Sequence, residues 1–362
     1  MNEKTPFIRI AKREDLPKSR IWMIRTIAFA VAILLGALIF LIAGTNPFTA
    51  YGTIIASSLG KITGIRQVIK IAVPLLGTAL ALAPCFAMRF WNIGGEGQIT
   101  MGAVAASFFA LNFAKTIPSP ILLLLMGIFA MVFGAMWAAI PAAFKARWGT
   151  NETLFTLMMN YIAIQLVSFA IMVWVPNGSS VMGVVNSSTE AGWLPMLFDK
   201  KYFLNVLVVA ILTAVMYVYL KYSKHGYEIS VVGESKNTAK YIGINVKKVI
   251  IRTMVLSGAI CGLAGFLLVS GTNHSISTGL ASGNGFTAIM VSWLAKFNPA
   301  IMVVTSFLIV FLQRGASEIA TNFNLNESVA DILTGVIIFF IIGCEFFINH
   351  QIKPHRKHKE DK

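Results

Sequence analysis

Charged residues are scarce in this sequence, and acidic residues are the scarcest. Only 12% of the 362 residues are charged, 15 of them acidic and 30 basic, whereas 56% are hydrophobic. A chain of this composition must place most of its length where water is absent. The shortage of charge therefore excludes a water-soluble globular protein and indicates a polytopic membrane protein.

Several motifs of soluble function are also missing. The three cysteines, Cys85, Cys261 and Cys344, lie inside apolar runs without metal-like spacing, which predicts packing roles and no metal site. No G-x-x-x-x-G-K-[ST] motif is present, so the chain does not bind ATP by that route and no cofactor is expected in it. No basic patch interleaved with aromatic residues supports nucleic acid as a partner. The net charge of +15 is instead attributed to membrane topology.

Long apolar runs predict an all-α membrane protein with about ten transmembrane helices. A bilayer core needs about 20 apolar residues per helical crossing. One stretch, 284–314, is interrupted by Lys296-Phe297-Asn298-Pro299, so two short segments are expected near 284–299. The runs are 26–44, 68–88, 97–113, 120–143, 152–175, 203–220, 253–271, 284–295, 299–314 and 330–349.

Ten crossings place both termini on one side of the membrane, and the basic tails predict that this side is cytoplasmic. The predicted organisation is a cytoplasmic tail at 1–25, a transmembrane domain at 26–349 and a basic cytoplasmic tail at 350–362. The first apolar run is too long for a signal-peptide core, so it is expected to remain as a helix. Three basic residues run against the charge bias, on the first outside loop: Lys61, Arg66 and Lys70.

The stretch Arg89-Phe90-Trp91-Asn92-Ile93-Gly94-Gly95-Glu96-Gly97-Gln98 places a carboxylate, two amides and three glycines between two apolar segments. Ionisable groups at membrane depth are costly and mark functional sites. Clustered glycines there favour a broken helix, expected near 84–98, or a close helix crossing. The alternative is a short cytoplasmic turn with a carboxylate at a helix start.

Other polar groups recur inside apolar segments. Glu152, Thr156 and Asn160 follow at i, i+4 and i+8, so they share one helix face, and Asp331 begins the last helix. Interhelical hydrogen bonding, or a carboxylate at a helix start, is the competing explanation for each. The candidate substrate-path residues are Asn92, Glu96, Gln98, Glu152, Thr156, Asn160 and Asp331.

The 221–252 loop is the one substantial cytoplasmic element. Ser235 is a candidate N-cap for a short helix that ends at Gly243, with Ala239 and Ile242 on one side as a docking face. The alternative is an amphipathic helix held to anionic headgroups by its lysines.

Three segments together resemble the permease subunits of bacterial ABC importers for simple sugars, nucleosides and branched-chain amino acids. They are NIGGEGQ at 92–98, GTNE at 149–152 with NYIA at 160–163, and GESKNTAKYIGI at 233–244 followed by LSGAICGLAG at 256–265. Residues 44–51 and 151–152 are most similar to the nucleoside branch. In the third segment, residues 235–237 depart from the usual N-P-x and Lys240 replaces an arginine, and these departures leave the implied docking role intact.

The resemblance implies a permease in the bacterial plasma (inner) membrane that forms the translocation path for a nucleoside, a purine nucleoside above all. It implies three partners: an ABC ATP-binding subunit that carries ATP and Mg, a second permease chain that is a paralogue or an identical copy, and an extracytoplasmic substrate-binding lipoprotein or periplasmic protein. This chain would then not be an enzyme. The expected coupling-loop residues are Gly233, Glu234, Ser235, Ala239, Lys240, Tyr241 and Gly243.

Other functions remain open from the sequence. A simple sugar such as a pentose is the nearest alternative substrate. An ion-coupled secondary transporter would also use membrane-depth carboxylates and broken helices. A gated channel is disfavoured, because no ring-forming charged filter or repeated pore motif is visible.

Overall fold

The structure is a computed structural model that describes residues 8–12, 17–175, 182–197, 202–323 and 325–354. Within these ranges the chain is helical apart from two five-residue strands. The outermost parts of the two tails, 1–7 and 355–362, lie outside the described residues. The helices fall into two compact units, one formed by residues 1–65 with 309–362 and the other by residues 66–308.

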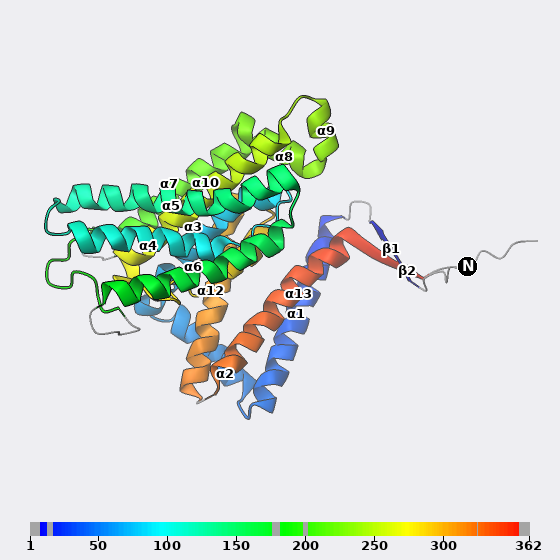
Figure 1. The fold of residues 1–362 in the computed structure, drawn as a ribbon. Helices are drawn as coiled ribbons and strands as arrows, with labels where there is room; N and C mark the ends of the chain where they lie inside the picture. The colour runs from blue at the N-terminus through cyan, green and yellow to red at the C-terminus, as the bar shows by residue number, and fades with distance from the viewer. Residues whose placement is uncertain (1–7, 13–16, 176–181, 198–201, 324, 355–362) are drawn as a thin grey trace, which may run out of the picture. The chain divides into compact units, whose positions relative to one another are not determined.

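The first unit, called unit 1 below, combines the two ends of the chain. Helices α1 (Lys18–Ile42) and α13 (Glu327–Asn349) pack side by side, and strands β1 (Ile8–Lys12) and β2 (His350–Pro354) pair antiparallel (Figure 1). Helix α2 (Pro47–Ser58) begins where Asn46 accepts a hydrogen bond from Phe48 N–H. This 12-residue helix was not among the predicted spans, although an asparagine cap followed by proline is a helix-start signal.

The second unit, called unit 2 below, holds most of the helices. Helix α3 (Ile62–Ala87) enters it at residue 66, and α12 (Pro299–Asn322) leaves it after residue 308. The elements between them are α4 (Gly95–Phe113), α5 (Ser119–Trp148), α6 (Glu152–Trp174), α7 (Phe203–Tyr222), α8 (Lys224–Glu234), α9 (Lys236–Tyr241), α10 (Val246–Leu268), the π-helical turn η1 (Val269–Asn273) and α11 (Asn284–Leu294).

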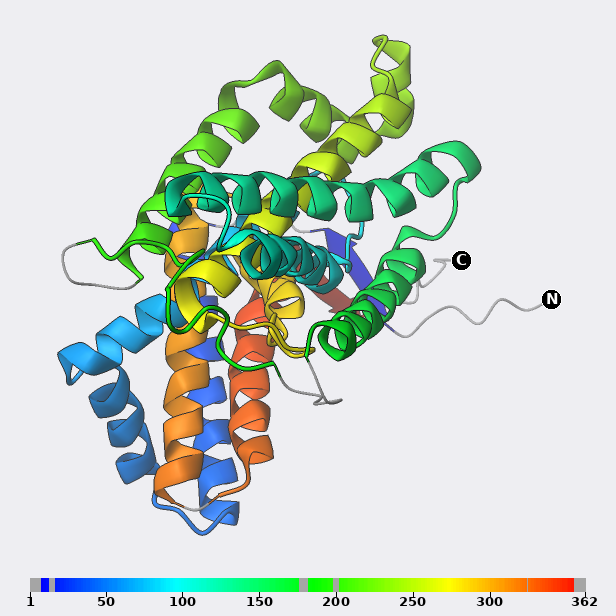
Figure 2. The same cartoon turned by 60° about the vertical axis from the view of Figure 1, so that its left-hand side comes forward.

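Glycines allow α10 to lie directly against α4 and α5, side by side with α5 in both views (Figure 1; Figure 2). A Cβ atom on Gly262 would collide with the carbonyl oxygen of Ala130, and one on Gly258 with that of Gly134. Small residues at such crossings bring helix backbones together. These α10 glycines therefore serve close helix packing.

The two predicted helix breaks are present. Helix α3 ends at Ala87 and α4 begins at Gly95; α11 ends at Leu294 and α12 begins at Pro299. In the second break Lys296 and Phe297 have φ angles of 50° and 59°, in the left-handed region that a continuous helix cannot include. Pro299 lacks the N–H that would continue the ladder, so the chain restarts there.

Seven of the described helices are long and apolar enough to cross a membrane. They are α1, α3, α5, α6, α7, α10 with its π-helical turn, and α12. Their outward faces carry many large apolar side chains, including Ile211 and Val304. In water such surfaces would cause association, whereas in a bilayer they contact hydrocarbon. The chain is a multi-pass membrane protein.

Candidate permeation and coupling sites

The turn between α3 and α4, residues 88–94, brings the predicted polar segment into the interior of unit 2. Arg89 leaves α3 with φ of 56°, and the side chains on either side of it, Met88 and Phe90, are buried. The backbone N–H of Phe90 donates to the carbonyl oxygen of Cys85 and closes the end of α3. The apolar anchors and the left-handed residue together direct the rest of the turn inward.

Two amides fix the end of this turn. Asn92 Oδ1 accepts from Gly94 N–H at 3.0 Å and from Gln98 Nε2 at 3.2 Å. Asn92 Nδ2 reaches Ser257 Oγ of α10 at 3.4 Å. Both amides are buried, and each finds partners within the chain. Their observed hydrogen bonds therefore hold the turn against α4 and α10.

Helix α6 closes over the same turn. Thr156 Oγ1 accepts from Ile93 N–H at 3.1 Å, and Asn160 Nδ2 donates to the Ile93 carbonyl oxygen at 2.9 Å. Asn160 Oδ1 accepts from Gly97 N–H at 2.8 Å. A Cβ atom on Gly97 would lie 2.9 Å from Asn160 Oδ1, so a side chain at this position would displace the Asn160 amide. The i, i+4 spacing read from the sequence thus brings Thr156 and Asn160 to one partner.

Glu96 joins two helix starts that are far apart in the sequence. Its carboxylate accepts from Gly283 N–H at 2.9 Å and from Gly285 N–H at 2.8 Å, across 187 and 189 residues. Gly283, with φ of 74°, precedes α11 and has no side chain to cap it. The carboxylate of α4 supplies that cap, where the free amides and the helix dipole favour negative charge.

The remaining two candidates lie elsewhere. Glu152 forms an ion pair with Lys145 at the junction of α5 and α6, where Asn151 caps α6. Asp331 is in α13, which belongs to unit 1, and its side chain lies outside the described residues. The structure thus brings Asn92, Gln98, Thr156 and Asn160 together. Glu96 lies beside them, in the first turn of α4.

An aromatic group that the sequence did not single out as a set lies at the ends of α3 and α11. The rings of Trp91 and Trp293 stack at 5.3 Å between centroids with 23° between their planes. Phe86 and Phe297 pack against them. The two indoles remain 46% and 42% exposed. Trp91 lies directly before the 92–98 motif, but its partner Trp293 is about 200 residues away along the chain, so no local pattern in the sequence indicates the pair.

The cytoplasmic segment predicted at 221–252 forms two short helices at one end of α10 (Figure 1). Ser223 caps α8, and Ser235 caps α9 by accepting from Thr238 N–H at 3.2 Å. Gly243 follows α9 with φ of 84°, as the predicted left-handed helix end requires. Arg252 of α10 pairs with Glu228 of α8 at 2.8 Å and ties the segment to the membrane helices.

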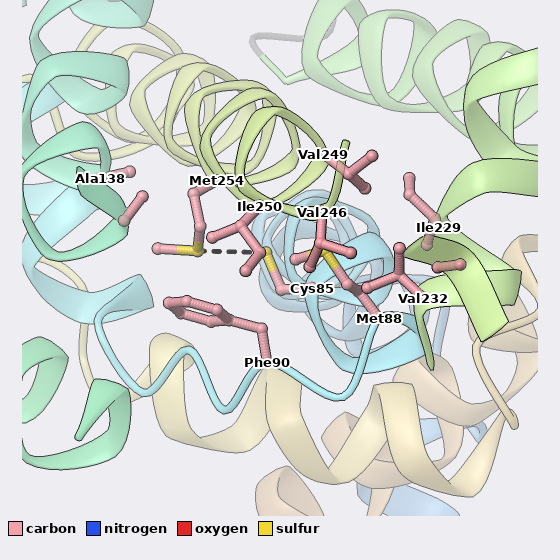
Figure 3. Packing of buried hydrophobic residues seen from close by; sticks show 12 residues of the cluster. Cys85, Met88, Phe90, Ala138, Ile229, Val232, Val246, Val249, Ile250 and Met254 are labelled. Atoms are coloured by element: carbon pink, nitrogen blue, oxygen red, sulfur yellow. Dashed lines mark hydrogen bonds between the residues drawn. The ribbon is translucent and has the colours of Figure 1, made fainter. Parts of the chain in front are cut away.

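The predicted docking side of α9 was wrong for Ala239. This side chain is 0% exposed and belongs to an apolar cluster that includes Ile229, Val232 and Val246. Figure 3 labels these three neighbours. An amphipathic helix buries its smallest apolar side chain against its own protein when the facing surface is apolar. The outward face of α9 instead presents Tyr241, which is 93% exposed, together with Lys236, Asn237, Thr238 and Lys240.

A second contact links the segment to the 88–94 turn. A Cβ atom on Gly233 would collide with the carbonyl oxygen of Ala87, so α8 lies directly on the end of α3. Exposed Arg89 borders a groove of about 320 Å³ whose other wall is residues 232–237. Movement of α8 and α9 would therefore act directly on the turn that carries Asn92.

Comparison with known proteins agrees with this arrangement. The family model "Branched-chain amino acid transport system / permease component" matches residues 64–342. The nucleoside ABC transporter permease protein NupB of Lactococcus lactis subsp. cremoris is 31% identical, covering 90% of this chain and 91% of that protein. The guanosine ABC transporter permease protein NupP of Bacillus subtilis is 29% identical, covering 88% and 92%. The glucose ABC transporter permease protein TsgB13 of Haloferax volcanii is 27% identical, covering 95% and 93%.

The match to the family model extends over most of the chain and includes the 88–98 segment and helices α8 and α9. They agree with the resemblance read from the three sequence motifs. The chain therefore belongs to the branched-chain amino acid transport system permease family and is the permease component of an ABC importer.

Proposed function

We propose that this permease imports nucleosides, with purine nucleosides as the preferred substrates. The observation that carries the proposal is the 31% identity to a nucleoside permease along nine-tenths of the chain. A nucleoside is neutral and carries a flat base, which suits aromatic surface. The half-exposed pair Trp91 and Trp293 offers such a surface beside the polar 92–98 segment.

In this proposal the predicted path residues shape the path and set its conformation. Asn92, Gln98, Thr156 and Asn160 hold the α3–α4 turn through bonds to the chain itself. Glu96 connects α4 to the start of α11, so opening between these helices requires its two hydrogen bonds to move. Glu152 and Asp331 are the two remaining residues proposed to belong to the substrate path.

The proposed assembly contains an ATP-binding subunit with ATP and Mg, a second permease chain and an extracytoplasmic substrate-binding protein. A permease without an ATP-binding motif needs such a subunit to drive uptake against a gradient. Its proposed docking surface is the exposed face of α8 and α9, from Glu234 to Tyr241, together with the Arg89 groove. Gly233, Ser235, Ala239 and Gly243 support this surface from within.

The proposed topology has ten crossings with both termini in the cytoplasm of a bacterial cell and the protein in its plasma (inner) membrane. Residues 26–349 would form the membrane domain, with tails at 1–25 and 350–362. The basic tails and the lysine-rich 221–252 segment then share the cytoplasmic side, as the charge bias requires. This topology places α8 and α9 in the cytoplasm, where the proposed ATP-binding subunit would contact them.

Uptake assays test the substrate assignment. They use a bacterial strain that lacks its own nucleoside transport and expresses this chain together with the transporter subunits encoded by the neighbouring genes. We expect uptake of radiolabelled guanosine, competed by unlabelled inosine and adenosine. Unlabelled ribose or glucose should leave it unchanged. Competition by a sugar, with no effect of nucleosides, would contradict the substrate assignment.

A sugar is the second candidate substrate, because a glucose permease is 27% identical over 95% of the chain. A pentose is the corresponding small sugar predicted from the sequence. Sugars also stack on aromatic side chains, but they lack the base that a Trp pair can contact over its full face. The competition experiment separates the two classes directly.

A further inference from the structure

An apolar cavity of about 400 Å³ lies between helices α3, α7 and α12 within unit 2, remote in sequence from the α3–α4 turn. Val73, Ala210 and Phe307 are among the residues in its wall. The two hydroxyl groups in the wall, of Thr213 and Ser306, each donate to a carbonyl oxygen of their own helix. The cavity therefore presents no polar group in need of a partner, and its occupant must be apolar.

The surroundings of the cavity are also apolar. Leu207 and Ile211 on α7 and Val304 on α12 carry exposed side chains close in sequence to the wall residues. In a membrane protein, exposed apolar faces of this kind contact lipid tails. The hydrocarbon chain of a membrane lipid thus matches the cavity in polarity and is supplied by the surrounding bilayer.

Two basic residues extend from the same face of α3. Arg66, Ile69, Lys70 and Val73 follow at i, i+3, i+4 and i+7, and both Ile69 and Val73 line the cavity. With a helical rise of 1.5 Å per residue, Arg66 lies roughly 4.5 Å along the axis from Ile69. Both charged groups can reach the mouth of the cavity with their side chains.

Among the described residues, these two charges have no partner of opposite sign. Helices α3 and α7 and residues 299–308 of α12 contain no aspartate or glutamate. Within the described part of the chain, neither Arg66 nor Lys70 forms an ion pair or a side-chain hydrogen bond. The charge bias that orders the other loops does not account for them either, because they oppose it. An external anion next to an apolar cavity satisfies both observations.

We propose that the cavity holds one acyl chain of an anionic phospholipid whose phosphate contacts Arg66 and Lys70. Arginine can bind a phosphate with two parallel hydrogen bonds, and lysine can extend its ammonium from a half-buried stem to the headgroup level. Basic residues between transmembrane helices are suited to anionic headgroups in this way. The lipid would lie against α3, the helix that leads into the α3–α4 turn.

Native mass spectrometry of the delipidated full-length chain with its partner subunits tests the proposal. We expect phosphatidylglycerol to bind at least tenfold more tightly than phosphatidylcholine. The double variant Arg66→Gln with Lys70→Gln should lose this preference, and Ala210→Phe, which fills the cavity, should weaken binding of phosphatidylglycerol at least tenfold. The double variant Lys247→Gln with Lys248→Gln, which removes two exposed lysines at the start of α10, should retain the preference.

Three results would overturn the proposal. One is failure of the charge test, seen either as equal affinity for the two lipids or as a preference that survives loss of Arg66 and Lys70. Another is full competition by glycerol 3-phosphate, which has the headgroup phosphate without tails and would indicate a simple anion site. The third is an efficient disulfide between two copies of an Ala210→Cys variant, which would show that a second copy covers the cavity. A Lys70→Arg variant that keeps the preference controls for folding.

Discussion

Replacing Glu96 with glutamine exchanges one carboxylate oxygen for an NH2 group and weakens the link between α4 and α11. Glutamine has one acceptor oxygen and an NH2 group, so it can accept from Gly283 or Gly285 but not from both. Hydrogen bonds to a charged group contribute about 1.5–3 kcal/mol each, a neutral one about 1 kcal/mol. The two present bonds would be replaced by one weaker bond, with one N–H facing another donor. The expected cost is about 3 kcal/mol of free energy of unfolding.

Thermal unfolding of the purified protein in lipid nanodiscs measures this cost, and uptake measures its effect on transport. The thermal midpoint should fall by several degrees, and uptake should decrease while the subunits still assemble. Glu318→Gln is the matched control, because Glu318 pairs with Arg314 one helical turn away on a partly exposed surface. Such a pair contributes about 0.3–0.5 kcal/mol. Equal midpoints and equal uptake for the two variants would refute the structural role assigned to Glu96.

Five further substitutions test three other parts of the structure. Gly134→Ala on α5 should lower the free energy of unfolding by about 1–3 kcal/mol, because its methyl group would collide with the backbone of α10. Gly127→Ala on the same helix should be tolerated in the same unfolding assay, because its methyl group would meet only ring atoms, the nearest at 3.8 Å. Ala239→Glu should prevent recovery of folded protein, since it buries a charge. Tyr241→Ala should fold normally, as judged by size-exclusion chromatography, and should reduce substrate-stimulated ATPase activity. The reverse pattern would show that the Ala239 side of α9 contacts the ATPase. Trp293→Ala should raise the KM for purine nucleoside uptake several-fold with little change in expression, and an unchanged KM would remove the indole pair from the path.

Features set by neighbouring residues were predicted well from the sequence. The interruption at Lys296–Pro299 follows from proline, and the short helix before Gly243 follows from a serine cap and a glycine end. Both depend on interactions within a few residues. Small residues at helical spacing, such as the buried glycines of α10, likewise indicate a close helix crossing from local sequence alone.

Features set by distant partners could not be predicted. The two N–H groups that Glu96 binds lie 187 and 189 residues away, and no local pattern identifies them. Ala239 is buried because it faces an apolar surface formed by α8 and α10. The six residues of α9 are too few for their periodicity to show which side of the helix faces the protein. Spacing identified Thr156 and Asn160 as one face, but it did not reveal that the partner of both is the 93–97 backbone.

The most direct measurement of the central claim is nucleoside uptake into proteoliposomes that contain this chain, its ATP-binding subunit, any second permease chain and the substrate-binding protein. The account predicts accumulation of radiolabelled guanosine that requires ATP and is abolished by a catalytically inactive ATPase subunit. Dissipating proton and sodium gradients should have no effect. Accumulation by this chain alone, driven by an ion gradient and indifferent to ATP, would contradict it.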